Sequence, residues 1–241
     1  MKLSHVATIT TALVIIVGIC LISPMFFRVP SPKNQPHVAL FLYVTGEGNS
    51  TSWCQEVGSY LGAETKATVF FIGTAVDENP KIVTSFGPHV DLGSLTYHYQ
   101  SILSSDDYTA QLLEIQEGKM AVDAAANVDS KLFAAPFGIV NNDIFSQLKR
   151  SGITADFSYT DHYNKLWNGT FITMPLKFVE GVNFNVGDLP KDAGDPPTVV
   201  VLRSTSSSAQ VIQTLQELKG AGFGFLSASD IVGFDLVGRG S

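Results

Sequence analysis

Cysteine is scarce in this chain, with only Cys20 and Cys54 among 241 residues. Cys20 lies in an apolar segment near the N-terminus, so the globular part of the chain contains Cys54 alone. A single cysteine excludes a disulfide framework, and it also excludes the CxxC motifs of zinc and redox sites. We expect Cys54 to be a core or surface thiol, because no Cys-His-Asn spacing accompanies it.

Basic residues are also few. The chain has 15 Lys and Arg residues against 22 Asp and Glu residues, which gives a formal net charge of −7. The basic residues form no cluster, so the sequence lacks the electrostatic footprint of a nucleic-acid-binding protein. Hydrophobic residues make up 45% of the chain, which is enough for one α/β domain with a sizeable core.

Charged residues are missing altogether between Val6 and Phe27. Lys2 precedes this run and Arg28 follows it. The run is long enough to span a bilayer, but a cleaved signal peptide with a long apolar region has the same character. We favour an uncleaved signal-anchor because no clean small-x-small cleavage site follows the run. Basic residues flank both ends, so they say little about its orientation.

The chain is therefore divided into residues 1–36, an N-terminal signal-anchor or signal peptide with a proline-rich linker, and a domain over residues 37–241. Both forms of the N-terminal segment place the domain on the exterior or in a lumen, so we expect a membrane-anchored or secreted protein. Two sequons agree with this location, and their asparagines, Asn49 and Asn168, are candidates for glycosylation.

Short apolar runs bounded by turn residues alternate with helical patterns along the domain. The run Val38–Val44 is continuous and ends at Thr-Gly-Glu-Gly, which is typical of a strand buried on both faces. Similar runs are Ala67–Gly73, His89–Gly93, Lys131–Gly138 and Thr198–Ser204. A long helix is expected over about 106–125, with a cap in Ser104–Asp106. Its apolar residues are spaced for one buried face, and they are Leu112, Leu113, Ile115, Met120, Ala121 and Ala124.

These runs resemble the strands of the polysaccharide deacetylases, the NodB-type family that includes the chitin deacetylases. The first strand of that family typically has the sequence V-A-L-T-F-D-D-G-P, and Val38-Ala39-Leu40 match its beginning. The run Ala67–Gly73 is similar to the family's A-T-F-F-V-x-G strand, and Lys131–Gly138 is similar to its F-R-P-P-Y-G segment. The resemblance extends over about 37–232. It implies an α/β fold, a distorted (β/α) barrel of the polysaccharide deacetylase type.

Other residues occupy the positions that carry the family's chemistry. Tyr43 and Val44 stand where the family has two aspartates, and Leu95 and Tyr99 stand where it has two metal-binding histidines. Ala134 replaces an arginine, and Arg203 replaces the histidine that acts as general acid. The resemblance implies a chemistry in which a zinc-like ion polarises an acetamide carbonyl and a water, while the second aspartate acts as base.

We predict a catalytically inactive deacetylase-like protein without the family metal, because none of the replacements binds a divalent metal well. The vestigial pocket is formed by Tyr43, Val44, Leu95, Tyr99, Ala134 and Arg203. A chitin-like or other N-acetylated polysaccharide is the partner that the resemblance implies, and a structural role is the alternative. Four aromatic residues are candidates for stacking on a sugar, namely Tyr43, Tyr97, Tyr99 and Phe137. Filling the volume left by metal and water explains them more simply.

Two other functions stay open. The first is an active metal-dependent deacetylase, a hydrolase of amide C–N bonds, that uses a divergent site. Glu47 and His98 follow the first and third strands and could face one pocket, but two ligands are too few for zinc. The remaining polar candidates are His37, His89, His162, Asp91 and Asp161, and an exposed or satisfied side chain is the simpler interpretation of each. The second function is a pure interaction or structural protein without affinity for sugars.

Overall fold

The computed structural model describes residues 35–100, 103, 106–139, 141–160, 163–167, 171–174, 177–192, 197–232 and 237–238. The chain divides into two compact units, Met1–Asn34 and Gln35–Ser241, and every described residue belongs to the second. The apolar run Val6–Phe27 therefore lies outside the described residues. Within them, no helix has both the length and the apolar character that a membrane crossing requires.

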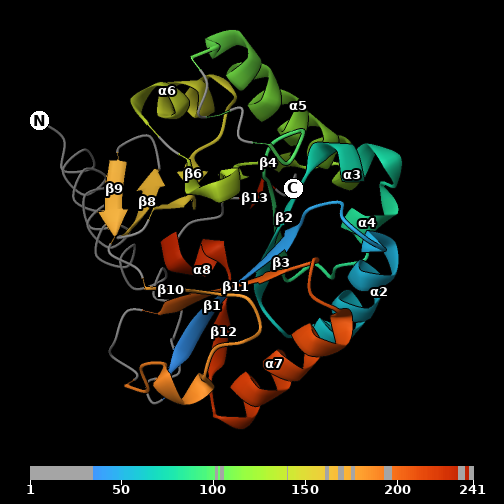
Figure 1. The fold of residues 1–241 in the computed structure, drawn as a ribbon, viewed down its shortest axis with the longest axis vertical. Helices are drawn as coiled ribbons and strands as arrows, with labels where there is room; N and C mark the ends of the chain where they lie inside the picture. Colours follow the sequence, from blue (N-terminus) through green and yellow to red (C-terminus); the bar gives the residue numbers. More distant parts are fainter. Residues whose placement is uncertain are drawn as a thin grey trace, which may run out of the picture. The chain divides into compact units, whose positions relative to one another are not determined.

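A sheet of eight strands forms the centre of the domain, and all of its strand pairs are parallel (Figure 1). The strands follow the order β10-β11-β1-β2-β3-β5-β6, and β12 pairs with the beginning of β1. Their bounds are β1 His37–Val44, β2 Ala67–Phe71, β3 Val90–Ser94, β5 Leu132–Phe133, β6 Ala155–Asp156, β10 Phe178–Glu180, β11 Thr198–Arg203 and β12 Gly224–Leu226. Helices connect most of the strands, which confirms the predicted α/β class and distorted (β/α) barrel.

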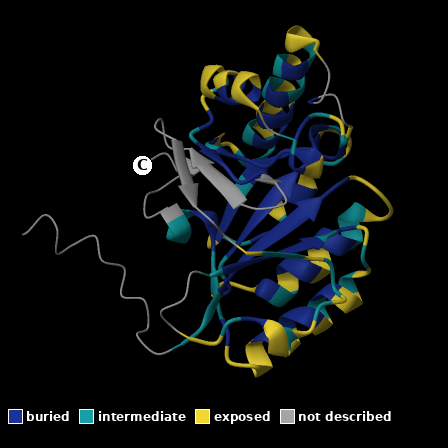
Figure 2. Cartoon of the chain, turned by 60° about the vertical axis from the view of Figure 1, so that its left-hand side comes forward, coloured by how far each residue is buried: buried dark blue, intermediate teal, exposed yellow. Residues whose placement is uncertain are grey.

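The central strand β1 separates two layers of the core because its side chains alternate between the faces of the sheet. Leu40, Leu42 and Val44 pack with the helices on the outer face. Phe41 and Tyr43 point to the other face, into an interior that is rich in aromatic rings. The strands β1, β2, β3 and β11 are almost entirely buried, β10 and β12 are only partly buried, and exposed residues are frequent on the outer sides of the helices (Figure 2). The continuous apolar run of β1 is therefore explained by burial on both faces.

Seven α-helices surround the sheet in the described part of the chain, namely α2 Ser50–Leu61, α3 Gly73–Glu78, α4 Lys81–Thr84, α5 Tyr108–Ala126, α6 Asn142–Arg150, α7 Ser208–Gly220 and α8 Ala228–Val232. Side chains of the preceding residues cap the longer ones. Asn49 accepts a hydrogen bond from the Ser52 amide at the start of α2, and Ser207 forms a capping box with Gln210 at the start of α7. Each cap satisfies backbone N–H groups that the helix itself leaves unpaired.

The remaining elements are short. They are β4 Asp129–Ser130, β7 Tyr159–Thr160, β8 Tyr163–Trp167, β9 Phe171–Met174 and β13 Val237–Gly238, with the 3₁₀ turns η2 Pro136–Gly138 and η3 Val186–Asp188. The strands β7, β8 and β9 form an antiparallel sheet of three strands, and β13 pairs with β4.

The buried face predicted for the long helix α5 is wrong in part. Leu113 is 47% exposed and Met120 is 65% exposed, and Ala124 is exposed as well. The helix instead buries Gln111, Ile115, Gly118, Lys119, Ala121 and Val122. Two of these residues are polar. They are buried because they bind other parts of the chain, not because they fill the core. The N-cap is Asp107, whose carboxylate accepts a hydrogen bond from the Ala110 amide, and not the predicted Ser104–Asp106.

The amino ends of β2 and β3 hold the short helix α8. The Thr68 hydroxyl accepts a hydrogen bond from the Ala228 amide at 2.7 Å, and the Asp91 carboxylate accepts one from the Ser229 amide at 2.8 Å. Asp230 within the helix accepts a third, from the Ser227 amide. Ala228 packs in the aromatic interior. Side chains of the sheet thus satisfy the first amides of a helix that closes this end of the core.

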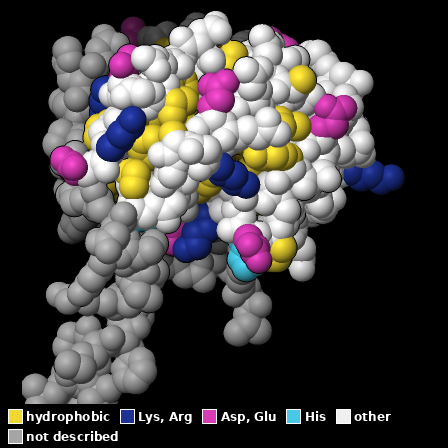
Figure 3. All heavy atoms as spheres, turned by 90° about the horizontal axis from the view of Figure 1, so that it is seen from below, with side chains coloured by type: hydrophobic (Ala, Val, Ile, Leu, Met, Phe, Trp, Pro, Cys, Tyr) yellow, Lys and Arg dark blue, Asp and Glu magenta, His cyan; other side chains and the backbone are white. Residues whose placement is uncertain are grey.

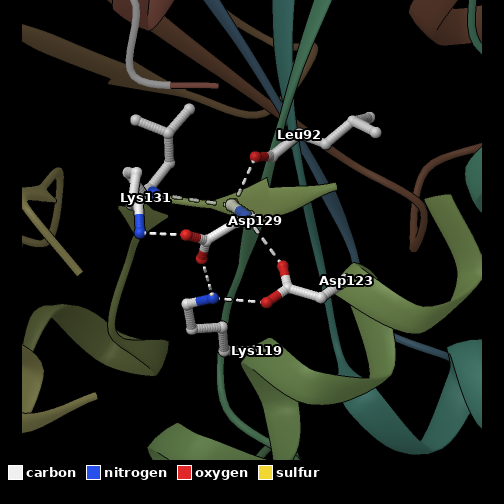
Figure 4. A network of polar contacts seen from close by, with 7 residues as sticks. Leu92, Lys119, Asp123, Asp129 and Lys131 are labelled. Carbon is white, nitrogen blue, oxygen red and sulfur yellow. Dashed lines mark hydrogen bonds and ion pairs between the residues drawn. The ribbon is translucent and has the colours of Figure 1, made fainter. Parts of the chain in front are cut away.

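A second polar network joins α5 to the strand β4, beside Leu92 of β3 (Figure 4). Lys119 forms ion pairs with Asp123 and Asp129, and the Asp123 carboxylate accepts a hydrogen bond from the Ser130 amide at 2.8 Å. Burial opposes the charge of Lys119, but the hydrogen bonds to both carboxylates outweigh it, so its pKa lies above the ordinary value. Lys119 therefore acts as the centre of the network.

Candidate functional site

The carboxyl ends of the strands meet along one edge of the sheet. Tyr43 of β1 is in register with Arg203 of β11. On the other side, Phe71 of β2 is aligned with Ser94 of β3, and Ser94 with Phe133 of β5. The loops that follow these strands therefore start side by side. This is the edge at which α/β folds usually place their chemistry.

Arg203 is the centre of this edge. Its guanidinium carbon lies 5.4 Å from the centre of the Tyr43 ring and 5.7 Å from the centre of the Tyr99 ring. The same group donates hydrogen bonds to the Tyr99 hydroxyl and to the Glu180 carboxylate. Burial lowers the pKa of Arg203, and the negative charge of Glu47 opposes that shift. A guanidinium remains protonated in this setting, so the centre of the edge carries a fixed positive charge.

Tyr99 also contacts Phe137, which follows β5. The centres of the two rings are 5.0 Å apart, with an angle of 44° between their planes. Phe137 is 59% exposed, and its backbone has φ 59° and ψ 13°. Such left-handed backbone is unfavourable for a bulky side chain. The chain therefore holds a large apolar ring in solvent, at a conformational cost, against the Tyr99 ring that contacts Arg203.

The other residues of the predicted vestigial pocket are buried. Leu95 and Ala134 belong to the aromatic interior with Tyr43, and each of the three is at most 2% exposed. Val44 points to the opposite face of the sheet, where it packs in the outer core. The structure thus brings Tyr43, Leu95, Tyr99, Ala134 and Arg203 to one face and separates Val44 from them.

The polar candidates of the displaced site do not converge on one another. The His98 ring contacts the Glu114 carboxylate at 2.7 Å, on α5. The neighbouring Tyr97 donates a hydrogen bond to Asp77 on α3, and this bond raises the pKa of its phenol. Glu47 instead lies close enough to Arg203 to act on its charge.

The remaining candidates have local roles or fall outside the described residues. Asp91 caps α8, and His89 is exposed. The ring of His37 lies beside Gly224 of β12. Asp161, His162 and Asn168 lie outside the described residues. Asn49 is exposed at the start of α2. Burial raises the pKa of the Cys54 thiol to about 12, so it does not supply a thiolate nucleophile.

Two residues of this edge escaped the sequence analysis. Glu180 lies in a segment with short apolar patches, and only its ion pair with Arg203 identifies it. Glu114 belongs to a helix whose periodicity gave no sign of a contact with His98. Both contacts join residues that are distant in the chain, and no local pattern reports such pairs.

The residues at this edge offer poor ligands for a divalent cation. Hydrocarbon side chains, phenols and a guanidinium occupy the aligned positions, whereas zinc is bound by thiolates, imidazoles and carboxylates. The fixed charge of Arg203 repels a second cation. Across the described residues, no group of three or more His, Cys, Asp and Glu residues is placed to hold a metal ion.

A surface cleft lies elsewhere, between α2 and α7 on the outer face of the barrel. Its lining includes Glu56, Tyr60, Ile212 and Gln213. In the view from below, apolar patches alternate with scattered acidic and basic side chains (Figure 3). This surface therefore presents mixed chemistry, without the convergence of aromatic and charged groups seen around Arg203.

The comparisons with known proteins agree with this geometry. A sequence model of the family "Polysaccharide deacetylase" matches residues 42–155. No curated protein matches the chain. The fold is similar to a family 4 carbohydrate esterase from Streptomyces lividans, solved with acetate, at 17% identity and a TM-score of 0.54. That match covers 79% of this chain and 91% of the other.

Two further solved structures are informative. The peptidoglycan deacetylase PdaC from Bacillus subtilis has 14% identity and a TM-score of 0.58, with 83% of this chain and 91% of the other covered. A pseudoenzyme of the same esterase family from Bacillus anthracis has 15% identity and a TM-score of 0.58, with 83% and 66% covered. A mutant of that pseudoenzyme has restored enzymatic activity. The sequence match covers residues 42–155, and these solved structures share the fold of the domain.

Proposed function

We propose that this chain is a catalytically inactive member of the polysaccharide deacetylase family that binds chitin-like or other N-acetylated polysaccharide. The observation that carries the proposal is the position of Arg203. Its guanidinium lies between the rings of Tyr43 and Tyr99 at the edge where the family matched by residues 42–155 would place its chemistry. Arg203 cannot act as a general acid near neutral pH, because its charge is fixed.

The same cluster argues against a family metal. The guanidinium of Arg203 occupies the place beside the rings of Tyr43 and Tyr99, and the aligned positions Leu95 and Tyr99 provide no imidazole for a divalent ion. Glu180, the nearest carboxylate in contact with the guanidinium, is already engaged in an ion pair. Without a metal to polarise the carbonyl and the water, amide hydrolysis loses its main source of transition-state stabilisation.

The proposal includes a location. An apolar N-terminal segment without charges between Val6 and Phe27 would hold the domain at a membrane facing the exterior or a lumen, or would direct its secretion. Asn49 supports this as a candidate glycosylation site, because its side chain is exposed at the surface of the domain. Polysaccharides of a surface or wall would be accessible there.

The test combines a zinc titration of the full chain by calorimetry with an assay for acetate release from acetylated chitooligosaccharides. We expect no stoichiometric zinc binding and no acetate, together with measurable binding of the oligosaccharide. Metal-dependent acetate release would overturn the proposal and establish an active enzyme with a divergent site.

Two variants locate any zinc binding that is seen. His98→Ala removes the histidine paired with Glu114, and His89→Ala removes an exposed histidine elsewhere as the matched control. If His98→Ala, but not His89→Ala, lost both zinc binding and acetate release, the divergent site would be assigned to His98. If the chain bound neither zinc nor glycan, the interaction or structural function would replace the proposed one.

A further inference from the structure

We infer that Tyr99 and Phe137 form a stacking surface, here called the aromatic rim, that binds the ring face of a neutral pyranose and does not require its acetamido group. The inference rests on the proposed function and deepens it by naming the chemical class of the ligand. It differs from recognition through the acetyl group, because the region behind the rim is filled by side chains.

The side chain of Phe137 is exposed although its backbone is strained. A phenyl ring that is 59% exposed contributes little to the core, yet its backbone is held at φ 59°. Glycine or asparagine would adopt this conformation at lower cost, so stability does not explain a phenylalanine here. Strained residues of this kind concentrate at ligand sites. The ring is therefore available for a partner with an apolar face.

Contacts with neighbouring side chains hold the aromatic rim in place. The Tyr99 ring supports Phe137 at 5.0 Å, and its hydroxyl accepts a hydrogen bond from Arg203. Arg203 is fixed in turn by its ion pair with Glu180 and by the Tyr43 ring. A preorganised aromatic surface loses little conformational entropy when it binds, which favours stacking on a flat ligand.

The charge around the rim is balanced. Arg203 is paired with Glu180, so the surroundings of the rim have no net positive charge. An acidic sugar would lose solvation without gaining a free cation. A neutral sugar can instead receive hydrogen bonds from the guanidinium and donate hydroxyl hydrogens to the carboxylate. The rim therefore suits a neutral pyranose better than a uronic acid.

The interior behind the rim has no room for an acetyl group. Behind the rim, Tyr43, Leu95 and Ala134 are at most 2% exposed, and they pack with Phe70 and Phe157 in the interior. An acetamido group would have to displace these side chains to enter the barrel. Overpacking of a close-packed interior is unfavourable. Contact is therefore limited to the ring face and the hydroxyl groups at the rim.

The experiment measures binding of three oligosaccharides to the full chain by calorimetry. Tetra-N-acetylchitotetraose and cellotetraose differ at the 2-position, and tetragalacturonate adds carboxylates. We expect Kd values for the first two within about threefold of each other, and a Kd for the third at least about tenfold higher. Binding of the acetylated sugar alone would overturn the independence from the acetyl group, while it would leave the proposed function standing.

The variant Phe137→Gly tests the rim itself. We expect at least about tenfold weaker binding of both neutral oligosaccharides, because the stacking face is lost. The melting temperature should not fall, because glycine relieves the left-handed strain. Met120→Ala removes another exposed apolar side chain, on α5, and should leave binding unchanged.

The remaining outcomes are decisive as well. Unchanged binding by Phe137→Gly would refute the aromatic rim but not polysaccharide binding elsewhere on the chain. Tighter binding of tetragalacturonate than of the neutral sugars would refute the argument from charge. If the wild-type chain binds none of the three, both the rim and the glycan-binding part of the proposed function fail.

Discussion

Two groups of polar side chains, one at each end of the parallel sheet, make different kinds of contact. At the amino end, Thr68 and Asp91 accept hydrogen bonds from the backbone amides of α8. At the carboxyl end, Arg203 bonds to the side chains of Glu180 and Tyr99, while Phe137 extends into solvent. The first arrangement satisfies backbone groups that would otherwise be buried without partners. The second satisfies side chains only, and it leaves a strained aromatic ring exposed.

This difference distinguishes side chains that the fold requires from side chains that are available to bind a ligand. Buried amides without partners are costly, so the amino end must be satisfied for the barrel to close. Replacing the aromatic and charged residues of the carboxyl end by a smaller polar set would leave the backbone hydrogen bonds intact. The contrast predicts that substitutions in the cap of α8 and in the Lys119 network, which both bind backbone amides, lower stability more than substitutions around Arg203, and that glycan binding follows the opposite order.

The largest loss of stability is expected for Lys119→Met in the network of Figure 4. The side chain is 10% exposed and binds both Asp123 and Asp129. Methionine preserves much of the volume but leaves two carboxylates without their common cation, so the free energy of unfolding should fall by about 1–3 kcal/mol. Urea denaturation at pH 7 measures the change. Met120→Ala, on the exposed side of the same helix, is the matched control and should change stability by less than about 0.5 kcal/mol.

A loss below that of the control would contradict the assignment of Lys119 as a stabilising centre. Glycan binding by Lys119→Met should equal that of the wild type wherever the protein is folded. A change in Kd without unfolding would contradict the separation between the Lys119 network and the Arg203 cluster.

The second prediction concerns the cap of α8. Asp91→Ala removes the acceptor of the Ser229 amide and should lower the free energy of unfolding by about 1–2 kcal/mol. Asp91→Asn retains an oxygen that can accept the same hydrogen bond, so it should lose less. Denaturation curves of the two variants test this order. Equal losses would mean that the charge of Asp91, rather than its acceptor oxygen, stabilises the helix.

Much of the fold could be predicted from the sequence because its signals are local. A continuous apolar run predicts the strand β1, and a similar run predicts β11. The buried face of α5 could not be read from hydrophobicity, because Gln111 and Lys119 are buried through specific partners while Leu113 and Met120 face solvent. The pattern of apolar residues reports burial only where hydrophobic packing is its cause.

The candidate site shows the same division. Its positions follow from a resemblance of strand ends, so Tyr43, Leu95, Tyr99, Ala134 and Arg203 were found from sequence and lie together. The orientation of Val44 toward the outer core follows from the alternation along β1, which the sequence comparison did not use. The strain at Phe137 and the pairing of Arg203 with Glu180 depend on tertiary contacts, and no spacing in the chain encodes them.

The third prediction is a dependence on pH in the Lys119 network. Hydrogen bonds from Lys119 and Lys131 hold the pKa of Asp129 below its ordinary value of 3.8. A lowered pKa in the folded state means that the carboxylate stabilises the fold above the ordinary value, and that this contribution is lost as the pH falls through the folded value. Asp129 is 59% exposed, so the contribution should be below about 1 kcal/mol.

The measurement compares the wild type with Asp129→Asn by urea denaturation. The difference in stability should be present at pH 7 and should shrink progressively below pH 3.8, the ordinary value for this carboxyl. High salt should reduce the difference at pH 7, because the pairs with Lys119 and Lys131 are partly exposed. A difference that is constant down to acidic pH would indicate that packing, not charge, distinguishes the two proteins.

A similarly small effect on stability is expected at the carboxyl end, for Arg203→Lys. Lysine retains the positive charge but lacks the planar fork that stacks on Tyr43 and Tyr99 while it bonds to Glu180. Glu180 is partly exposed and can be hydrated when the pair weakens, so the loss should be about 0.5–1 kcal/mol. Binding should suffer more, because Tyr99 loses the hydrogen bond that orients it beneath Phe137. Urea denaturation and calorimetry with cellotetraose measure the two effects on one sample. Weakened binding with nearly wild-type stability would support a role of Arg203 in binding rather than in folding. A stability loss as large as that of Lys119→Met would show that Arg203 and Lys119 serve the fold equally.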